Sequence, residues 1–313
     1  MGKYCFGIDV GGTTIKCGLF QTDGTLVEKW EIPTRTANNG EAILPDVAAT
    51  VLKKIEEKRI DSSDVAGVGI GLPGPVNDKG EIACAVNLHW GYKDVEKELS
   101  AMTHLPSKAG NDANVAALGE AWKGAAEGAR NVIMATLGTG VGGGIIVDGK
   151  ILAGAHGAGG EIGHANIEHS ETETCNCGNK GCLEQMASAT GIARLAKKEL
   201  EASTDDTPLR HKKHISAKDV LDYYKEGDAV CIRIMEKVAE YLGGALGIFA
   251  CVVDPEVIVI GGGVSKAGQP LVDIIQKYYR ECTFRLCKDT PIVIATLGND
   301  AGIYGSAKLV INE

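Results

Sequence analysis

One histidine and three cysteines near the middle of the chain have a spacing that could hold a metal ion. They fall within 19 residues and are His164, Cys175, Cys177 and Cys182. Thiolates and a neutral imidazole form the tetrahedral donor set of closed structural zinc sites, and the Gly-, Asn- and Lys-rich sequence between the cysteines can bend around an ion. The C-x-C spacing differs from the common C-x2-C, so ordinary free thiols are the alternative. Because three cysteines in eight residues are hard to explain otherwise, we expect one zinc site with these four ligands.

Two glutamates accompany these four residues. Glu161 lies three residues before His164, and Glu184 lies two residues after the last cysteine. A metal that fixes the loop would also hold two carboxylates and an imidazole edge close together. Ionised carboxylates accept hydrogen bonds in fixed directions, so such a cluster suits the hydroxyls of one polyol. The alternative is that both glutamates are solvated loop acids.

A candidate general base stands where a helix of small residues is predicted. The pair Asn111-Asp112 precedes this helix, and a helix start stabilises and orients a carboxylate. The alternative is that Asp112 only caps the helix. The chain also contains a near-copy, Asn299-Asp300, that opens the last predicted helix. We therefore expect at least one of the two aspartates to be only a cap.

Glycine- and threonine-rich turns follow three of the predicted strands. Exposed backbone amides and threonine hydroxyls in such turns can receive phosphate oxygens, and a carboxylate at a strand end can hold Mg²⁺ through water. A single Gly-Gly turn could be just a hairpin, but turns in duplicated positions favour a nucleotide cleft. We expect Asp9 to serve the Mg²⁺ ion, and the residues expected to bind nucleotide are Gly11, Gly12, Thr13, Thr14, Lys16, Gly138, Thr139, Gly140, Gly262 and Gly263.

Two segments, 69–74 and 138–143, match the Gly-x-Gly-x-x-Gly pattern of dinucleotide-binding proteins. Neither is predicted to open a helix, because the first runs into Pro75 and the second into another strand. The helix N-terminus that would hold a pyrophosphate is therefore missing. No Gly-x4-Gly-Lys-Ser/Thr segment exists either, which excludes the Walker type of nucleotide site.

The elements that must position these residues occur in a repeated order. The first third of the chain predicts strands at 3–10, 13–20 and 26–32, a helix at 38–58 and a strand at 65–70. A second series predicts strands at 130–137, 145–147 and 150–152, helices at 183–202, 216–224 and 229–249, a strand at 256–260, a helix at 270–282, a strand at 292–295 and a helix at 301–310. The repetition predicts a duplicated α/β fold with a cleft between its halves.

Composition and charge limit the class of protein. The chain has 313 residues, of which 44% are hydrophobic and 23% charged, which is enough for two domains. Its net charge of −9 disfavours nucleic acid as a partner. The chain has no apolar run of about 18 residues and no signal-peptide pattern, so we expect no membrane contact and a cytoplasmic location. The other seven cysteines are scattered singly, as in a reducing compartment.

Taken together, these motifs resemble those of the sugar kinases of the ROK family, most closely its bacterial ATP-dependent glucokinases. The resemblance runs nearly from end to end, and its most specific part is the knuckle His-x10-Cys-x-Cys-Gly-x3-Cys. The segments that carry it are 9–16, 69–75, 111–114, 138–144, 159–164, 175–184 and 261–263.

The resemblance implies an actin-like ATPase fold, which is ribonuclease H-like and duplicated, with the sugar between two domains. We expect a small domain at 1–110, onto which a helix at 300–313 packs, and a large domain at 111–299 that carries the knuckle 164–182. In such enzymes the aspartate matching Asp112 is the general base. The residues that bind the sugar match Asn111, Asp112, Glu161, His164 and Glu184, and Asn87 lies in a segment that looks like the glucokinase branch.

The resemblance further implies transfer of the γ-phosphate of ATP, with Mg²⁺, to the 6-hydroxyl of glucose by a homodimer or homotetramer. The alternatives are the same reaction on N-acetylmannosamine, N-acetylglucosamine, mannose or fructose, or a sugar sensor without catalysis. Family members that repress transcription carry a DNA-binding domain before the first phosphate motif. That motif begins here at Asp9, so we expect no such domain.

Overall fold

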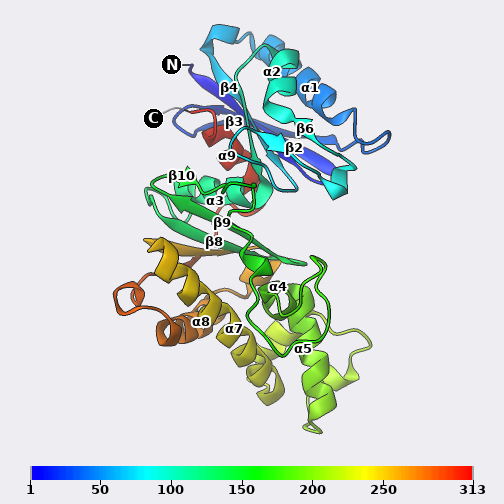
Figure 1. Cartoon of the computed structure of the whole chain (residues 1–313), viewed down its shortest axis with the longest axis vertical. Coiled ribbons are helices and arrows are strands. Elements are labelled where there is room, and N and C mark those ends of the chain that lie inside the picture. Colours follow the sequence, from blue (N-terminus) through cyan, green and yellow to red (C-terminus); the bar gives the residue numbers. More distant parts are fainter. Residues whose placement is uncertain (1, 312–313) are drawn as a thin grey trace. The chain divides into compact units, whose positions relative to one another are not determined.

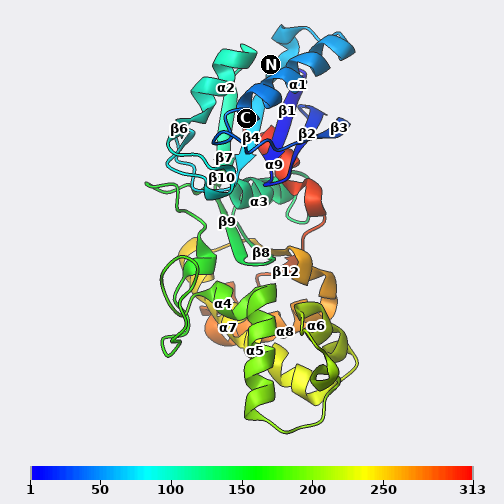
Figure 2. The ribbon, with the colours of Figure 1, turned by 90° about the vertical axis from the view of Figure 1, so that its right-hand side faces the viewer.

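The computed structural model describes residues 2–311 (Figures 1 and 2). The chain divides into two compact units and contains two five-stranded sheets. Unit 1 contains the residues up to Arg130, Gly144–Gly160 and the residues from Thr296 onward, and unit 2 contains Asn131–Gly143 and Glu161–Ala295. No helix among residues 2–311 combines the length and the apolar character needed to cross a membrane.

The sheet of unit 1 has the strand order β3-β2-β1-β4-β7. Its strands are β1 (Tyr4–Val10), β2 (Thr14–Gln21), β3 (Leu26–Pro33), β4 (Val65–Leu72) and β7 (Ser107–Asn111). Strand β2 is antiparallel to β1 and β3, whereas β4 is parallel to β1 and β7. The short strands β5 (Glu81–Ile82) and β6 (Lys93–Asp94) form a separate antiparallel pair.

Helices cover both faces of this sheet. Successive residues of β1 point to opposite faces, so their contacts show which helix covers each face. Phe6 and Ile8 join one buried cluster with the apolar face of α1 (Ile43–Lys58), and Cys5 joins another with α9 (Ala301–Lys308). A side chain at Gly7 would collide with the backbone of α9, 1.9 Å from the Ile303 oxygen. Helices α2 (Val95–Thr103) and α3 (Asp112–Lys123) complete the unit.

The second sheet has the order β10-β9-β8-β11-β12, and the boundary between the units falls within β9. Its strands are β8 (Val132–Leu137), β9 (Val141–Val147), β10 (Lys150–Ile151), β11 (Val257–Gly261) and β12 (Ile292–Ile294). Strand β11 is parallel to β8 and β12. Both sheets thus place the third, second, first, fourth and fifth strands of their series in the same order, which confirms the predicted duplication.

Unit 2 contains four helices between β10 and β11 and a fifth between β11 and β12. They are α4 (Leu183–Ala187), α5 (Ala189–Ala202), α6 (Ala217–Lys225), α7 (Ala229–Val253) and α8 (Gln269–Cys282). Short 3₁₀ helices occur at η1 (Ser62–Asp64), η2 (Val86–Leu88), η3 (Ile162–His164), η4 (Pro208–His211), η5 (Gly263–Ala267), η6 (Arg285–Cys287) and η7 (Gly298–Asp300).

Several predicted bounds were wrong. The helix predicted at 38–58 begins only at Ile43, because Asn38, Asn39 and Gly40 have positive φ. The strand predicted at 145–147 begins earlier, at Val141, because the glycine turn ends at Gly140. The helix predicted at 183–202 is two helices that meet at Ser188, whose backbone is extended at φ −74° and ψ 169°.

The units also differ from the predicted domain ranges 1–110 and 111–299. Unit 1 continues to Arg130, because α3 packs tightly on α9: a side chain at Gly305 would lie 1.6 Å from the Val115 oxygen. Strand β7 and helix α2 were not predicted. Residue 1, and residues 312 and 313 of the terminal helix expected at 300–313, lie outside the described residues.

Candidate functional site

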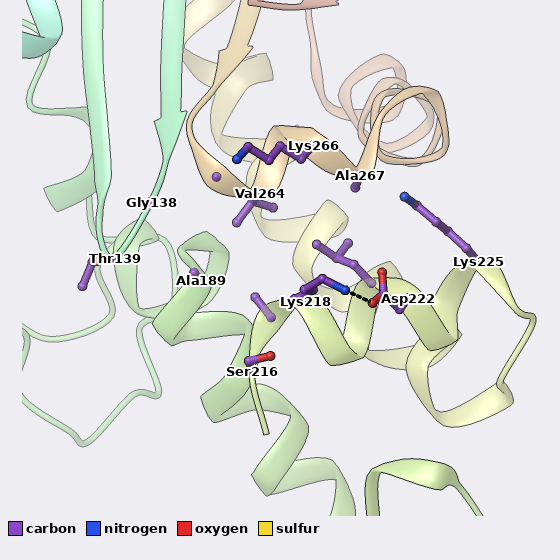
Figure 3. Close-up of a pocket in the computed structure, with 13 residues that line it drawn as sticks. Gly138, Thr139, Ala189, Ser216, Lys218, Asp222, Lys225, Val264, Lys266 and Ala267 are labelled. Atoms are coloured by element: carbon purple, nitrogen blue, oxygen red, sulfur yellow. Dashed lines mark hydrogen bonds and ion pairs between the residues drawn. The ribbon is translucent and has the colours of Figure 1, made fainter. Parts of the chain in front are cut away.

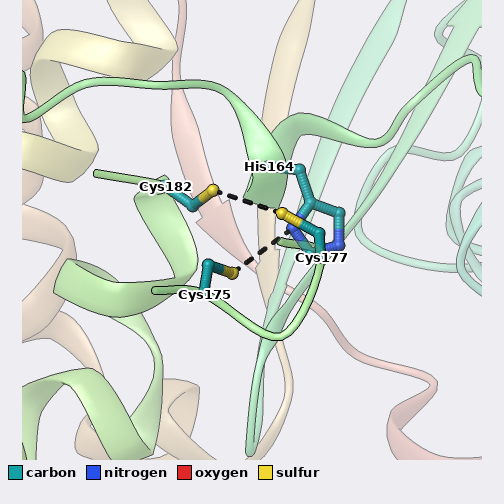
Figure 4. Close-up of side chains that lie close together, drawn as sticks. All are labelled: His164, Cys175, Cys177 and Cys182. Atoms are coloured by element: carbon teal, nitrogen blue, oxygen red, sulfur yellow. Dashed lines mark hydrogen bonds between the residues drawn. The ribbon is translucent and has the colours of Figure 1, made fainter. Parts of the chain in front are cut away.

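In unit 2 the four predicted zinc ligands gather at one point (Figure 4). One donor atom from each of His164, Cys175, Cys177 and Cys182 lies within 4.8 Å of all the others. Cys177 Sγ lies 3.6 Å from Cys182 Sγ, and Cys175 Sγ lies 3.9 Å from His164 Nδ1. Zinc–sulfur bonds of about 2.3 Å in a tetrahedron place sulfurs about 3.8 Å apart. The donor set and its spacing therefore fit a tetrahedral zinc ion.

A tight backbone turn makes this spacing possible. The backbone N–H of Cys175 donates to the Asn179 oxygen at 2.7 Å, and that of Gly178 donates to the Cys175 oxygen at 2.9 Å. Gly181 has φ 71°, and a side chain there would meet the Glu168 oxygen at 2.1 Å. Burial raises the pKa of the Cys182 thiol to about 12. Thiolates at this position therefore need a cation to stabilise them.

The two predicted glutamates lie beside the cluster. Glu161 Oε2 is 3.9 Å from His164 Nε2, so the two ring nitrogens of His164 face different groups, Nδ1 the cluster and Nε2 this carboxylate. Glu184 Oε1 accepts from Cys175 Sγ at 3.5 Å, and its Oε2 accepts from the backbone N–H of Val141 at 3.2 Å. The structure thus places Glu161 and Glu184 beside the four donors, of which His164 is one.

A cavity of about 450 Å³ in unit 2 includes the second glycine turn (Figure 3). Gly138, Thr139 and Gly263, three of the residues predicted to bind nucleotide, line it. The neighbouring Gly262 has φ 81°, and a side chain there would lie 2.5 Å from the Leu137 oxygen.

Helix α6 and the 3₁₀ helix η5 supply charged residues to this cavity that were not predicted. Lys218 pairs with Asp222, and Lys225 and Lys266 also line the cavity (Figure 3). The apolar part of the lining consists of Val264, Ala267, Leu221, Ala217 and Ala189. No local sequence signal marks these residues, because only the fold brings α6 and η5 to the turn after β8.

In unit 1 the first glycine turn joins β1 to β2, and Asp9 is paired with Lys16 in the register of these strands. The N–H of Gly11 donates to the Thr14 oxygen, and Thr34 Oγ1 donates to the Gly11 oxygen. A side chain at Gly12 would meet nothing within 4 Å, so the backbone at this tip is open. Lys16 Nζ donates to the Asn299 oxygen at 2.9 Å.

Asp9 is held in a largely buried position against α9. A side chain at Gly302 would lie 2.7 Å from Asp9 Cγ, so only glycine leaves room for this carboxylate. Burial raises the pKa of Asp9 to about 6, Lys16 opposes the rise, and the charge of Asp112 adds to it. Asp9 and Asp112 are therefore close enough for their charges to interact.

Asp112 is the first residue of α3, but it does not cap the helix. The cap is Asn111, whose Oδ1 accepts from the N–H groups of Ala113 and Asn114. The Asn111 amide also donates to the Gly74 oxygen at 3.1 Å. Asp112 is exposed, so its carboxylate is accessible to a ligand.

The near-copy at Asp300 has different contacts. Asp300 makes no side-chain cap, and its carboxylate pairs with Lys29 Nζ at 2.6 Å. Asn87 is exposed within η2 of unit 1. Each predicted site residue thus has a defined place in its own unit.

Comparison with known proteins gives consistent results. A family model described as the ROK family matches residues 5–313. A glucokinase of Halalkalibacterium halodurans is 44% identical over 98% of this chain and 95% of its own length, and a glucokinase of Thermotoga maritima is 33% identical over 97% and 96%.

Solved structures agree. A ROK hexokinase from Thermus thermophilus has a TM-score of 0.82 and 30% identity over 98% of this chain and 97% of its own. A ROK glucokinase from Streptomyces griseus in complex with glucose and AMPPNP has a TM-score of 0.74 and 32% identity over 98% of each chain. The predicted actin-like ATPase fold, which these ROK kinases have, is confirmed for this chain. Because the matching model spans nearly all of its length, the chain belongs to the ROK family.

Proposed function

We propose that the protein is an ATP-dependent glucokinase, which transfers the γ-phosphate of ATP to the 6-hydroxyl of D-glucose. The observation that carries this proposal is the 44% identity to a glucokinase over nearly the full length of both chains. An N-acetyl-D-glucosamine kinase of Haemophilus influenzae is 28% identical, and an N-acetylgalactosamine kinase of Shewanella is 29% identical. Glucose is therefore the favoured substrate.

Asp112 is the general base in this proposal. Its carboxylate accepts the proton of the 6-hydroxyl as the sugar oxygen attacks the γ-phosphate in line. Its position at the first turn of α3 supports the role, because Asn111 takes over the capping and leaves the Asp112 carboxylate exposed. Glucose and ATP react directly, and the mechanism needs no covalent enzyme intermediate.

The sugar-binding residues are Asn87, Asn111, Asp112, Glu161, His164 and Glu184. Glu161, Glu184 and the Nε2 edge of His164 supply hydrogen-bonding groups of fixed direction beside the cluster. The amide of Asn111 retains one N–H for a hydroxyl after donating to Gly74. These groups recognise and orient hydroxyls, and Asp112 alone moves a proton.

The nucleotide binds along the glycine turns. In unit 2, Gly138, Thr139 and Gly140 contact the phosphates, and Gly262 and Gly263 contact the nucleoside. Gly138, Thr139 and Gly263 line the cavity, which supports this placement. In unit 1, the turn Gly11–Thr14 and Lys16 contribute further phosphate contacts. Asp9 would hold Mg²⁺ through water, and the bound ion would neutralise charge on the phosphates.

The cluster of His164, Cys175, Cys177 and Cys182 holds a structural zinc ion. The ion supplies the fixed geometry of the knuckle, so that Glu161, His164 and Glu184 stay together. The distances between the donors support this assignment. We further propose that the active protein is a homodimer or homotetramer, which light scattering coupled to size exclusion will test.

A coupled assay over several hexoses and phosphoryl donors tests the proposed function. The panel contains glucose, mannose, fructose, N-acetylglucosamine and N-acetylmannosamine, each with ATP, ADP or polyphosphate. We expect the highest kcat/KM for glucose with ATP. A higher value for another sugar would assign the chain to a different ROK kinase, and the absence of any turnover would favour a sugar sensor.

A further inference from the structure

The turn Gly138–Gly140 after β8 is pinned to the junction between α4 and α5. The N–H of Ala189 donates to the Gly138 oxygen at 2.8 Å, and Thr190 Oγ1 donates to the Thr139 oxygen. The carbonyls of Gly138 and Thr139 are therefore both held by the first residues of α5. This contact explains why the chain breaks its helix at Ser188.

Pinning the carbonyls fixes the direction of the amides. In a planar trans peptide the C=O and the following N–H point in opposite directions. The held carbonyls of Gly138 and Thr139 thus turn the N–H groups of Thr139 and Gly140 away from α5. Within residues 2–311 neither N–H has a hydrogen-bond acceptor, and Thr139 is exposed. Two adjacent free amides form a concave site for an anion.

The hydroxyl of Thr190 is itself held in place. Ser188 is fully buried, and its Oγ accepts from the N–H of Gly191 at 2.9 Å. Ser188 Oγ lies 3.0 Å from Thr190 Oγ1. Because Thr190 uses its proton on the Thr139 oxygen, the Ser188 hydroxyl donates to Thr190. The hydrogen bond from Ser188 therefore fixes the orientation of the Thr190 hydroxyl, so that its proton points to the Thr139 oxygen.

We propose that Thr190 is a positioning residue for the phosphoryl donor: its hydroxyl orients the Thr139 and Gly140 amides that receive the donor phosphates. The inference rests on the proposed function in naming ATP as the ligand. Thr190 touches neither substrate in this scheme and acts through the turn. Glu184 holds the next amide, that of Val141, so the turn is fixed on both sides.

Thr190→Val, which keeps the shape and removes the hydroxyl, tests the proposal against Thr190→Ser, which keeps the hydroxyl. A lost hydrogen bond of this kind corresponds to about a threefold to tenfold change in an equilibrium constant. We expect Thr190→Val to raise the KM for ATP by about this factor and to leave the KM for glucose unchanged at saturating ATP. Thr190→Ser should restore the parental KM for ATP.

Direct binding separates this inference from the proposed function. Calorimetry with AMPPNP, with inorganic tripolyphosphate and with adenosine should show weaker binding of the two phosphate ligands to Thr190→Val and unchanged binding of adenosine. A protein without kinase activity that still showed this pattern would refute the proposed function and retain the role of Thr190.

The matched control is Thr290→Val. Thr290 Oγ1 also donates to a backbone carbonyl, that of Pro255, which precedes β11 at the end remote from Gly261. We expect parental binding of all three ligands. An equal loss in Thr290→Val, an equal loss for adenosine, or a failure of Thr190→Ser to restore phosphate binding would overturn the proposal. If Thr190→Val does not fold, Thr190→Ala takes its place with the same expected results.

Discussion

Asp300 and Lys29 form an ion pair of 2.6 Å, and this pair distinguishes the two Asn-Asp segments of the chain. Asp300 precedes α9 and pairs with a lysine, and Asp112 is exposed at the first turn of α3. The two aspartates were indistinguishable by their local sequence. In the proposed function only Asp112 is the general base.

Asp112→Asn should lower kcat by about 10² to 10⁴, because it removes general base catalysis. Binding of glucose, measured by calorimetry, should survive. Asp300→Asn is the matched control and should retain turnover. Because Lys29 is 55% exposed and Asp300 31%, solvent screens their pair, and its loss should leave the free energy of unfolding nearly unchanged. An Asp300→Asn enzyme as inactive as Asp112→Asn would contradict the assignment.

Elemental analysis should find about one zinc ion per chain, since four donors form one tetrahedral site. Cys177→Ser should lower the zinc content and raise the KM for glucose more than the KM for ATP, because Glu161 and His164 lose their fixed geometry. Cys251→Ser, an exposed cysteine on α7, is the control and should behave like the parent. A fully active preparation that contains no zinc would remove the metal from the proposal.

Much of the fold could be predicted from local pattern. Strands β1 and β8 are apolar runs that end in glycines, and both were located to within two residues. Strand β7 was missed, because its sequence Ser-Lys-Ala-Gly-Asn has little strand propensity. Its pairing with β4 imposes the extended conformation, which is a tertiary effect that local sequence does not record.

The candidate site divides in the same way. The four zinc donors lie close in sequence, so their spacing alone predicted that they would meet. The break at Ser188 depends on a contact between Ala189 and Gly138, which are far apart in sequence, and a helical pattern continues through it. The lysines of the nucleotide cavity were missed for the same reason, since α6 and η5 meet the turn after β8 only in the folded chain.

Glu120→Gln should destabilise the protein strongly for an isosteric change. Glu120 is fully buried, and its Oε2 accepts from the N–H groups of Ala125 and Thr296 at 2.7 and 3.1 Å, while its Oε1 accepts from the N–H of Leu297 at 2.9 Å. An amide NH₂ in place of either oxygen would face N–H donors and leave them unsatisfied. We expect a loss of about 1 to 3 kcal/mol in the free energy of unfolding, measured by urea denaturation.

The control for this change is Glu127→Gln. Glu127 is exposed and pairs with Lys123 four residues earlier on the chain, so its neutralisation should cost less than about 0.5 kcal/mol. Equal midpoints for the Glu120 and Glu127 variants would show that the buried carboxylate contributes no more than a surface one.

Asp9 should give the unliganded protein a distinctive pH dependence. Its pKa is raised by burial to about 6 in the folded chain, against about 3.9 when unfolded. Between these values the folded state keeps a proton that the unfolded state has lost. The free energy of unfolding therefore falls as pH rises from about 4 to 6. Above pH 6 the destabilisation caused by the buried, ionised Asp9 carboxylate is fully present.

Asp9→Asn removes this cost and should stabilise the unliganded protein at pH 7.5 by at most about 3 kcal/mol. The same change should lower kcat/KM for ATP, because the carboxylate proposed to hold Mg²⁺ through water is gone.

In the parent enzyme, kcat/KM for ATP should fall as the pH drops through about 6. A higher Mg²⁺ concentration should move this midpoint to lower pH, since the cation favours the ionised carboxylate of Asp9. Urea denaturation at pH 5 and pH 7.5 and a pH profile at two Mg²⁺ concentrations measure these effects. If Asp9→Asn is no more stable than the parent at pH 7.5, burial of the Asp9 carboxylate does not destabilise the folded protein. If the pH midpoint of the parent enzyme does not change with Mg²⁺ concentration, Asp9 does not interact with the ion.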